Sequence, residues 1–247
     1  MWMFFDPVYL LVLIVAGVLS GAAVLYTKSA YARAKQVPIA RRMSGADVAR
    51  AILDAKDIHD VQVVEHQGFL SDHYNPMTKT LALSPEVYRG QHAAAAGIAA
   101  HEVGHAIQHA FGYLPLQLRS LLVPVANIGS NLGLWLVIIG IVLASMQGAT
   151  AAEAGGFIKG LAVTGVVLFG AAALFTLVTL PVEFDASARA KTILTEMGFT
   201  TYGEEEQAVR SMLRAAGLTY VAAAVGALLQ LLYWAWRAGL LSGGRRE

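Results

Sequence analysis

Four long apolar runs dominate the pattern of hydrophobic and polar positions along the chain. They cover residues 8–26, 121–146, 157–180 and 218–236. At 1.5 Å per residue, an apolar helix of about 20 residues crosses the roughly 30 Å hydrocarbon core of a bilayer. The pattern therefore predicts a mainly α-helical integral membrane protein with about four transmembrane helices. A bend is expected near Pro124, and a kink or break at Pro181.

The charges beside these runs predict an orientation. The residues before the first run contain no Lys or Arg, whereas Lys28, Arg33 and Lys35 follow it, which favours a membrane anchor over a cleaved signal peptide. Residues 27–119 and 183–216 together hold 14 of the 18 Lys and Arg, so this side is expected to be cytoplasmic. The basic tail falls on the opposite side, so either the fourth run is re-entrant or the other loops outweigh it.

Shorter elements lie between the runs. Residues 44–56 begin with a Ser cap and continue as an amphipathic helix, and residues 61–64 and 80–83 alternate as short strands around a turn-rich segment. Ser84-Pro85-Glu86 opens the helical stretch that leads to residues 93–111. We expect a single domain over residues 1–247, whose cytoplasmic part, residues 27–119 and 183–216, forms a small α+β subdomain.

Composition agrees with a membrane protein. The chain is 56% hydrophobic and 14% charged, with a mean hydropathy of +0.55, whereas soluble domains carry about 25% charged residues. The net charge is +1 and no basic patch with interleaved aromatics occurs, which argues against a nucleic-acid partner. Cysteine is absent, which excludes disulfides, thiolate metal ligands and a cysteine nucleophile.

The chemically informative stretch is residues 93–111, AAAAGIAAHEVGHAIQHAF. On a helix, His101 and His105 lie one turn apart on one face and can bind one metal ion. Glu102 projects about 100° further round, within reach of a water at that ion. This set is what metal-assisted hydrolysis needs. The alternative, a pair of core histidines satisfied by hydrogen bonds, does not account for the carboxylate between them.

A catalytic zinc ion takes three protein ligands, so a third must come from elsewhere. Glu183 and Asp185 follow the third run on the expected side of the membrane, and Glu183 is favoured for its longer reach. Glu153 lies in the opposite loop. His109 is one turn beyond His105 and is interpreted either as a residue that supports a ligand or as a structural one. The remaining histidines lie in the soluble stretch before the motif, at positions 59, 66, 73 and 92.

Three segments carry a family resemblance: HYNPMTKTLALSPEVY at 73–88, IAAHEVGHAIQHA at 98–110 and LPVEFDASARA at 180–190. They resemble the YugP-type family of bacterial membrane zinc metallopeptidases, related more distantly to the HtpX and CAAX prenyl protease group. This resemblance implies a gluzincin in which His101, His105 and Glu183 bind one catalytic Zn²⁺ and Glu102 is the base. The wider group has an aspartate four residues after the ligand glutamate. This chain has Ser187 there, with Asp185 two residues earlier.

The expected function is a zinc endopeptidase of the bacterial inner or plasma membrane, with its active site on the cytoplasmic side. Its substrates would be membrane proteins or membrane-bound peptides, in contact with membrane lipid. In zincins a strand beside the motif helix offers its edge to the substrate. Here the candidate is Thr80, Leu81, Ala82 and Leu83, the alternative being an ordinary buried strand. A homo-oligomer or a regulatory partner is left open.

Two other functions are compatible with parts of the sequence. One is a non-proteolytic scaffold or regulator with a structural zinc, which would gain nothing from Glu102. The other is a zinc-responsive transport protein, with Asn127 and Asn131 lining a path. Together with Ser130, these two form a polar helix face that otherwise serves hydrogen bonding between helices. Transport would need ionisable residues along the membrane runs, which are nearly free of them.

Overall fold

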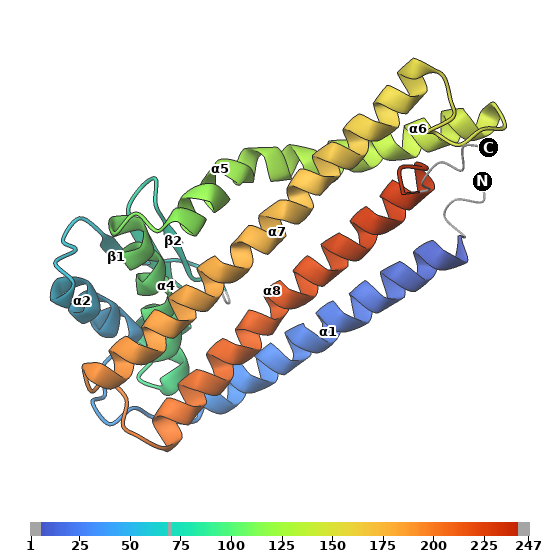
Figure 1. Cartoon of the computed structure of the whole chain (residues 1–247). Helices are drawn as coiled ribbons and strands as arrows, with labels where there is room; N and C mark the ends of the chain where they lie inside the picture. The colour runs from blue at the N-terminus through green and yellow to red at the C-terminus, as the bar shows by residue number, and fades with distance from the viewer. Residues whose placement is uncertain (1–5, 69–70, 242–247) are drawn as a thin grey trace. The chain divides into compact units, whose positions relative to one another are not determined.

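The computed structural model describes residues 6–68 and 71–241 (Figure 1). In chain order its elements are α1 (Pro7–Lys35), α2 (Gly45–Ala55), β1 (Gln62–Glu65), β2 (His73–Asn75), β3 (Thr80–Leu83), α3 (Pro85–Arg89), α4 (Ala93–Ala110), α5 (Leu114–Ile128), the π-helical turn η2 (Gly129–Gly133), α6 (Leu134–Met146), α7 (Gly156–Glu196) and α8 (Glu204–Arg237). They form two compact units. The apolar unit holds the described residues of 1–21, 118–179 and 221–247, and the motif unit holds those of 22–117 and 180–220.

Four helical segments are long and apolar enough to cross a membrane, as the four runs predicted: residues 7–35, 114–146, 156–196 and 204–237. The last of these is the single uninterrupted helix α8, so the chain neither breaks nor reverses within the fourth segment. The break expected at Pro181 is wrong, because α7 continues through this residue to Glu196. Proline removes one backbone donor. The buried neighbours Val182, Glu183 and Ala186 keep the helix packed there.

Glycines bring η2 and α6 close to α7 within the apolar unit. A Cβ on Gly129 would lie 2.3 Å from the Leu168 carbonyl oxygen, and one on Gly140 would lie 2.9 Å from Ala162 Cβ. Helices of membrane proteins associate through such small residues because apolar area gains nothing by moving from lipid to protein. The irregular turn lies at Gly129–Gly133, five residues beyond the predicted bend at Pro124.

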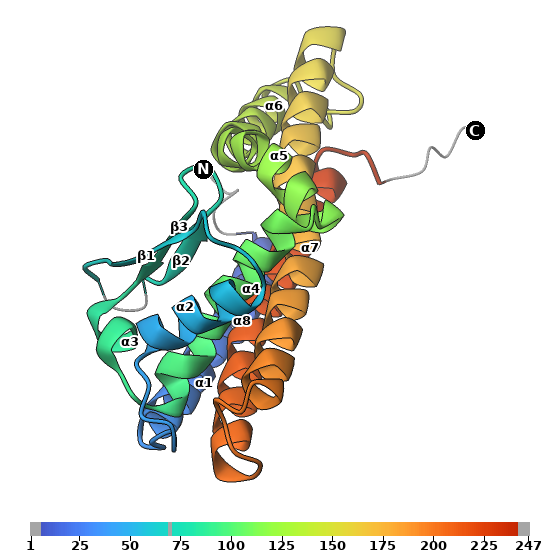
Figure 2. The same cartoon turned by 90° about the vertical axis from the view of Figure 1, so that its left-hand side faces the viewer.

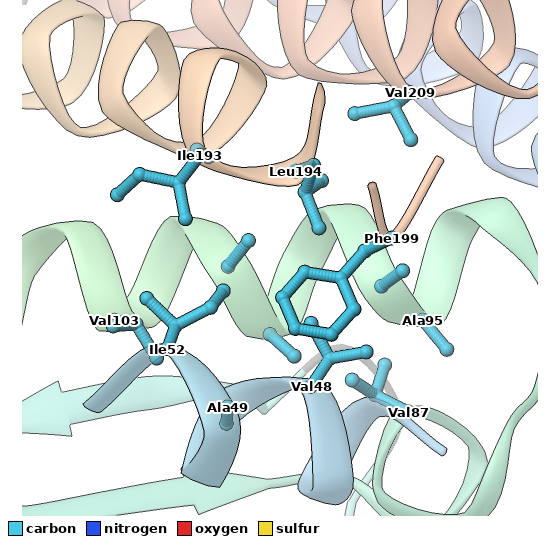
Figure 3. Close-up of a cluster of buried hydrophobic side chains, with 14 of the residues drawn as sticks. Val48, Ala49, Ile52, Val87, Ala95, Val103, Ile193, Leu194, Phe199 and Val209 are labelled. Atoms are coloured by element: carbon cyan, nitrogen blue, oxygen red, sulfur yellow. The ribbon is translucent and has the colours of Figure 1, made fainter. Parts of the chain in front are cut away.

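In the motif unit, α4 is packed between α2 on one side and the ends of α7 and α8 on the other (Figure 3). The cap predicted at Ser44 is present and forms a capping box: its hydroxyl accepts the amide hydrogen of Asp47, whose carboxylate accepts the Ser44 amide hydrogen. The alanines that open α4 are fully buried and let its neighbours approach closely. The core therefore holds α4 from both sides and fixes the direction in which its polar face points.

The three-stranded sheet has the order β1-β3-β2, with β1 parallel and β2 antiparallel to β3 (Figure 2). The two expected strands are present, but β2 was not predicted, since its three residues lie within the turn-rich segment. Asn75 makes the turn possible: its side-chain oxygen accepts the Met77 amide hydrogen at 2.9 Å and reverses the chain into β3. Thr80–Leu83 is thus the middle strand and has no free edge, contrary to the expectation from the sequence.

Candidate metal centre

The motif helix α4 presents His101 and His105 on one face, as predicted. Their ring centroids are 4.8 Å apart and nearly perpendicular. The residue before the helix, His92, caps its N-terminus, since its Nδ1 accepts the amide hydrogen of Ala95. His105 is buried, and the His101 side chain is 14% exposed. Both imidazoles are held at the margin of the core, where a small opening to solvent remains.

Glu183 on α7 completes the cluster, although it lies 82 residues after His101 in the chain. Its Oε2 lies 3.2 Å from His101 Nε2 and 3.6 Å from His105 Nε2. Gly104 permits this approach, since a Cβ there would lie 2.8 Å from the Ala186 carbonyl oxygen on α7. Helices α4 and α7 therefore meet backbone to backbone beside the three side chains.

The three side chains fit a zinc ion. One potential ligand atom from each lies within 4.8 Å of the other two, and no second group of this kind occurs among the described residues. Zinc with bonds of about 2.0–2.1 Å in a tetrahedron holds neighbouring ligand atoms about 3.4 Å apart. The two distances from Glu183 bracket that value. Two imidazoles and one carboxylate are a donor set of catalytic zinc sites, and one coordination position stays open.

Comparison with known proteins assigns the chain to a family. Residues 9–239 match the family described as "Putative neutral zinc metallopeptidase". The chain belongs to this family. It is 42% identical over 205 residues to the "Putative membrane protease YugP" of Bacillus subtilis (strain 168), an alignment that covers 83% of this chain and 85% of that protein. No solved structure gave a significant match.

In this metallopeptidase, Glu102 lies next to the cluster on the same helix and is only 8% exposed. No described residue forms a hydrogen bond with its carboxylate, which leaves both oxygens available to a water molecule. Burial opposes a positive charge on His105, but contact with Glu183 and the negative charge of Glu102 together raise the pKa of His105. The two carboxylates thus place negative charge beside His105 and favour a cation there.

Asp72, just before β2, adds a further carboxylate near Glu102. Its Oδ1 accepts hydrogen bonds from the Ser84 amide at 2.7 Å and from the Ser84 hydroxyl at 3.0 Å. Burial raises the pKa of Asp72, the bonds from Ser84 lower it, and the charge of Glu102 raises it further, so that the pKa lies above the usual value. Sequence reasoning did not single out Asp72, because an aspartate in a turn-rich segment is ordinarily a turn residue.

The outer nitrogens of both histidines have partners. Ser187 Oγ lies 3.1 Å from His101 Nδ1, and Gln108 Oε1 lies 3.0 Å from His105 Nδ1. Ser187 lies four residues after Glu183 on α7 and contacts the histidine itself. Gln108 was missed by the sequence analysis. Its spacing of three residues from His105 places both on one helix face, and that is the only sequence signal for it.

Asp185 and His109, the two nearest alternatives to Glu183, have other contacts. Asp185 Oδ2 accepts hydrogen bonds from Gln108 at 2.8 Å and from Arg189 Nε at 2.5 Å. His109 Nδ1 lies 2.8 Å from the Tyr74 hydroxyl. Neither side chain belongs to the three-residue cluster, so the structure favours Glu183 as the predicted third ligand.

The remaining candidates have local structural contacts. Glu153, in the apolar unit, accepts hydrogen bonds from the amide and hydroxyl of Thr150. His59 lies 2.8 Å from an Asp57 oxygen, and the rings of His66 and His73 pack edge to face. None of these four residues joins the cluster.

The polar face predicted around Asn127 opens onto a cavity of about 700 Å³ within the apolar unit. Asn127 and Ser130 line it, together with Ser20, Thr176 and Gln230 from the other long helices, whereas Asn131 does not. Among the described residues that line this cavity, none is ionisable. A path for zinc ions would need such ligands, so the cavity gives no support to the transport interpretation.

Proposed function

We propose that this family member is a zinc-dependent endopeptidase that cleaves membrane proteins or membrane-bound peptides near the cytoplasmic membrane surface. The observation that supports it best is the convergence of His101, His105 and Glu183, beside the carboxylate of Glu102, which has no hydrogen-bond partner among the described residues. A purely structural zinc site would be closed by a fourth protein ligand. We assign three ligands and a base to the described residues, which is the composition of a hydrolytic site.

The roles in hydrolysis follow from the positions of these residues. His101, His105 and Glu183 would hold one zinc ion, which when bound polarises the peptide carbonyl and lowers the pKa of water towards about 7. Glu102 accepts the proton of the attacking water and then delivers it to the leaving amine. Because its carboxylate has no competing hydrogen-bond donor among the described residues, Glu102 can carry that proton in both directions.

We place the substrate along β2 in place of the strand expected from the sequence. β2 has β3 on one side and no described strand on the other, and it packs against α4. Tyr74 fixes it there through the bond from its hydroxyl to His109 on the motif helix. An extended segment of substrate can add to this edge through backbone hydrogen bonds. Thr80–Leu83 pairs with the opposite edge of β2.

The cytoplasmic location is part of the proposal. It rests on the charge count, because 14 of the 18 Lys and Arg lie in residues 27–119 and 183–216. Those ranges also contain all four residues assigned to the chemistry.

The test is a pair of measurements on the detergent-solubilised full chain: zinc content and hydrolysis of fluorescein-labelled casein, with and without chelator. Glu102→Gln should retain zinc and lose about 10²–10⁴ in rate or more, because it removes a general base. His105→Ala should lose both zinc and activity. Glu196→Gln, an exposed acid on α7 that undergoes the same charge change, should lose neither.

Three outcomes contradict parts of this proposal. Full activity in Glu102→Gln would remove the base assignment. Wild-type chain that binds zinc but shows no chelator-sensitive cleavage of casein or of a reconstituted single-span membrane protein would favour the scaffold alternative. Wild-type chain that binds no zinc would refute the metal site itself.

A further inference from the structure

The amide side chain of Gln108 is fully buried and makes three short contacts. Its Oε1 lies 3.0 Å from His105 Nδ1, and its Nε2 lies 2.8 Å from both the Val182 carbonyl oxygen and Asp185 Oδ2. All three partners surround the metal centre, and the last two flank Glu183 in the sequence of α7. Gln108 thus connects one predicted zinc ligand on α4 to the segment that carries another.

The partners of Gln108 determine which way its amide points. A backbone carbonyl can only accept a hydrogen bond, and Asp185 accepts at this oxygen too, because Arg189 Nε donates to it at 2.5 Å. The Gln108 amide therefore donates both of its hydrogens to acceptors on α7. The flipped amide would place its oxygen against two acceptors in a buried site, leaving groups unsatisfied at a cost of about 1–3 kcal/mol each.

With the amide oxygen turned toward α4, the presence of a hydrogen on His105 Nδ1 is also determined. The amide oxygen can only accept, so His105 Nδ1 must carry the hydrogen and donate it. The lone pair of the neutral imidazole then lies on Nε2, the nitrogen that faces Glu183. Zinc binds a neutral imidazole through its unprotonated nitrogen, so this is the tautomer that can act as a ligand.

His101 lacks such a constraint. Its Nδ1 faces the hydroxyl of Ser187 at 3.1 Å, and a hydroxyl can either donate or accept. Ser187 therefore accommodates both tautomers of His101.

We infer that Gln108 is a positioning residue that holds His105 in its zinc-binding tautomer, and that Asp185 acts on the metal centre only through Gln108. The inference rests on the zinc site of the proposed function. It assigns a role to Asp185 that is neither ligation nor direct contact with a histidine. Asp185 and the Val182 carbonyl orient Gln108, and Gln108 orients His105.

The experiment measures zinc affinity of the full chain in detergent by competition with a chromophoric chelator. Gln108→Leu replaces the amide with an apolar group of similar size. It should weaken zinc binding by about 10–100-fold, the usual effect of removing a residue that orients a ligand. It should also alter the visible spectrum of the Co²⁺-substituted protein. Ser187→Ala is the matched control: it removes the partner of the other histidine and should cause a smaller loss.

Two variants of Asp185 separate orientation from a structural ion pair. In Asp185→Asn the amide oxygen can still accept from Gln108, so zinc affinity and the Co²⁺ spectrum should stay close to wild type although the pairing with Arg189 is lost. Asp185→Ala leaves only the Val182 carbonyl to orient Gln108, so its affinity should fall between wild type and Gln108→Leu. Thermal unfolding of each metal-free variant reports whether it is folded. If Gln108→Leu does not fold, the comparison of zinc affinity between Asp185→Asn and Asp185→Ala tests the inference by itself.

The outcomes that overturn the inference differ from those that overturn the proposed function. Wild-type zinc affinity in Gln108→Leu would refute it, and so would an equal loss in Ser187→Ala. Equal losses of zinc affinity in Asp185→Asn and Asp185→Ala would refute it as well, because they would show that Asp185 acts through its ion pair with Arg189. None of these results touches the peptidase assignment. Absence of zinc binding in the wild-type chain would refute both.

Discussion

Gly104, the fourth residue of the motif His101-Glu102-Val103-Gly104-His105, offers the sharpest test of the metal centre. A Cβ at this position would lie 2.8 Å from the Ala186 carbonyl oxygen and 3.1 Å from Ala186 Cα. Ordinary contact begins at 3.4 Å, so Gly104→Ala must separate the α4 and α7 backbones by about 0.6 Å. The end of a flexible side chain can move aside, but the backbone atoms of two packed helices cannot move without shifting the helices.

This displacement is large for a metal site. Metal–ligand distances tolerate about 0.2 Å, and Glu183 lies only three residues from the point of contact. We expect Gly104→Ala to weaken zinc binding about tenfold or more, which corresponds to ~1.4 kcal/mol. The measurement is chelator competition in detergent, with thermal unfolding of the metal-free chain in parallel.

Gly97→Ala on the same helix is the control. Its Cβ would meet Met212 Cε at 2.9 Å and Val209 Cγ1 at 3.2 Å, which are ends of side chains. Both substitutions gain the same intrinsic helix preference of alanine over glycine, about 1 kcal/mol. The difference in zinc affinity between the two variants therefore reports the effect of moving α7 away from α4. If the two variants bind zinc equally well, the close crossing does not position Glu183 and the geometric reasoning fails.

Two further predictions concern stability. Asp72 has a raised pKa in the folded chain, so the folded state binds more protons than the unfolded state above pH ~4, and stability should decline as pH rises from there through the folded pKa. Asp72→Asn should flatten that decline in unfolding measured across mildly acidic pH; an unchanged slope would contradict it. In the apolar unit, Gly129→Ala should destabilise the chain by about 1–3 kcal/mol through overpacking against Leu168. Gly160→Ala, which meets nothing within 4 Å, should be neutral or stabilising in the same denaturation assay.

Local patterns predicted the local parts of the structure well. The long helices follow from uninterrupted apolar runs, and α2 from its Ser44 cap and the spacing of its apolar residues. The pairing of His101 with His105 is a property of one helix, so the sequence alone determines it.

What the sequence could not predict depends on contacts between distant segments. The three residues of β2 are too few for a periodic signal, and they form a strand because β3 provides a partner. That pairing places Thr80–Leu83 in the middle of the sheet. Likewise, Pro181 usually ends a helix, but packing of α7 against α4 keeps it continuous, and the role of Gln108 becomes visible only when Val182 and Asp185 are beside it.

The separation of 82 residues between His101 and Glu183 has a consequence for biosynthesis. A nascent chain that has emerged only as far as α4 carries two of the three proposed ligands and the proposed base, but not the third donor. Tight capture of the ion must await synthesis of α7 and its docking beside Gly104. The order of the elements along the chain therefore keeps an unfinished protease inactive until its third long apolar helix is in place.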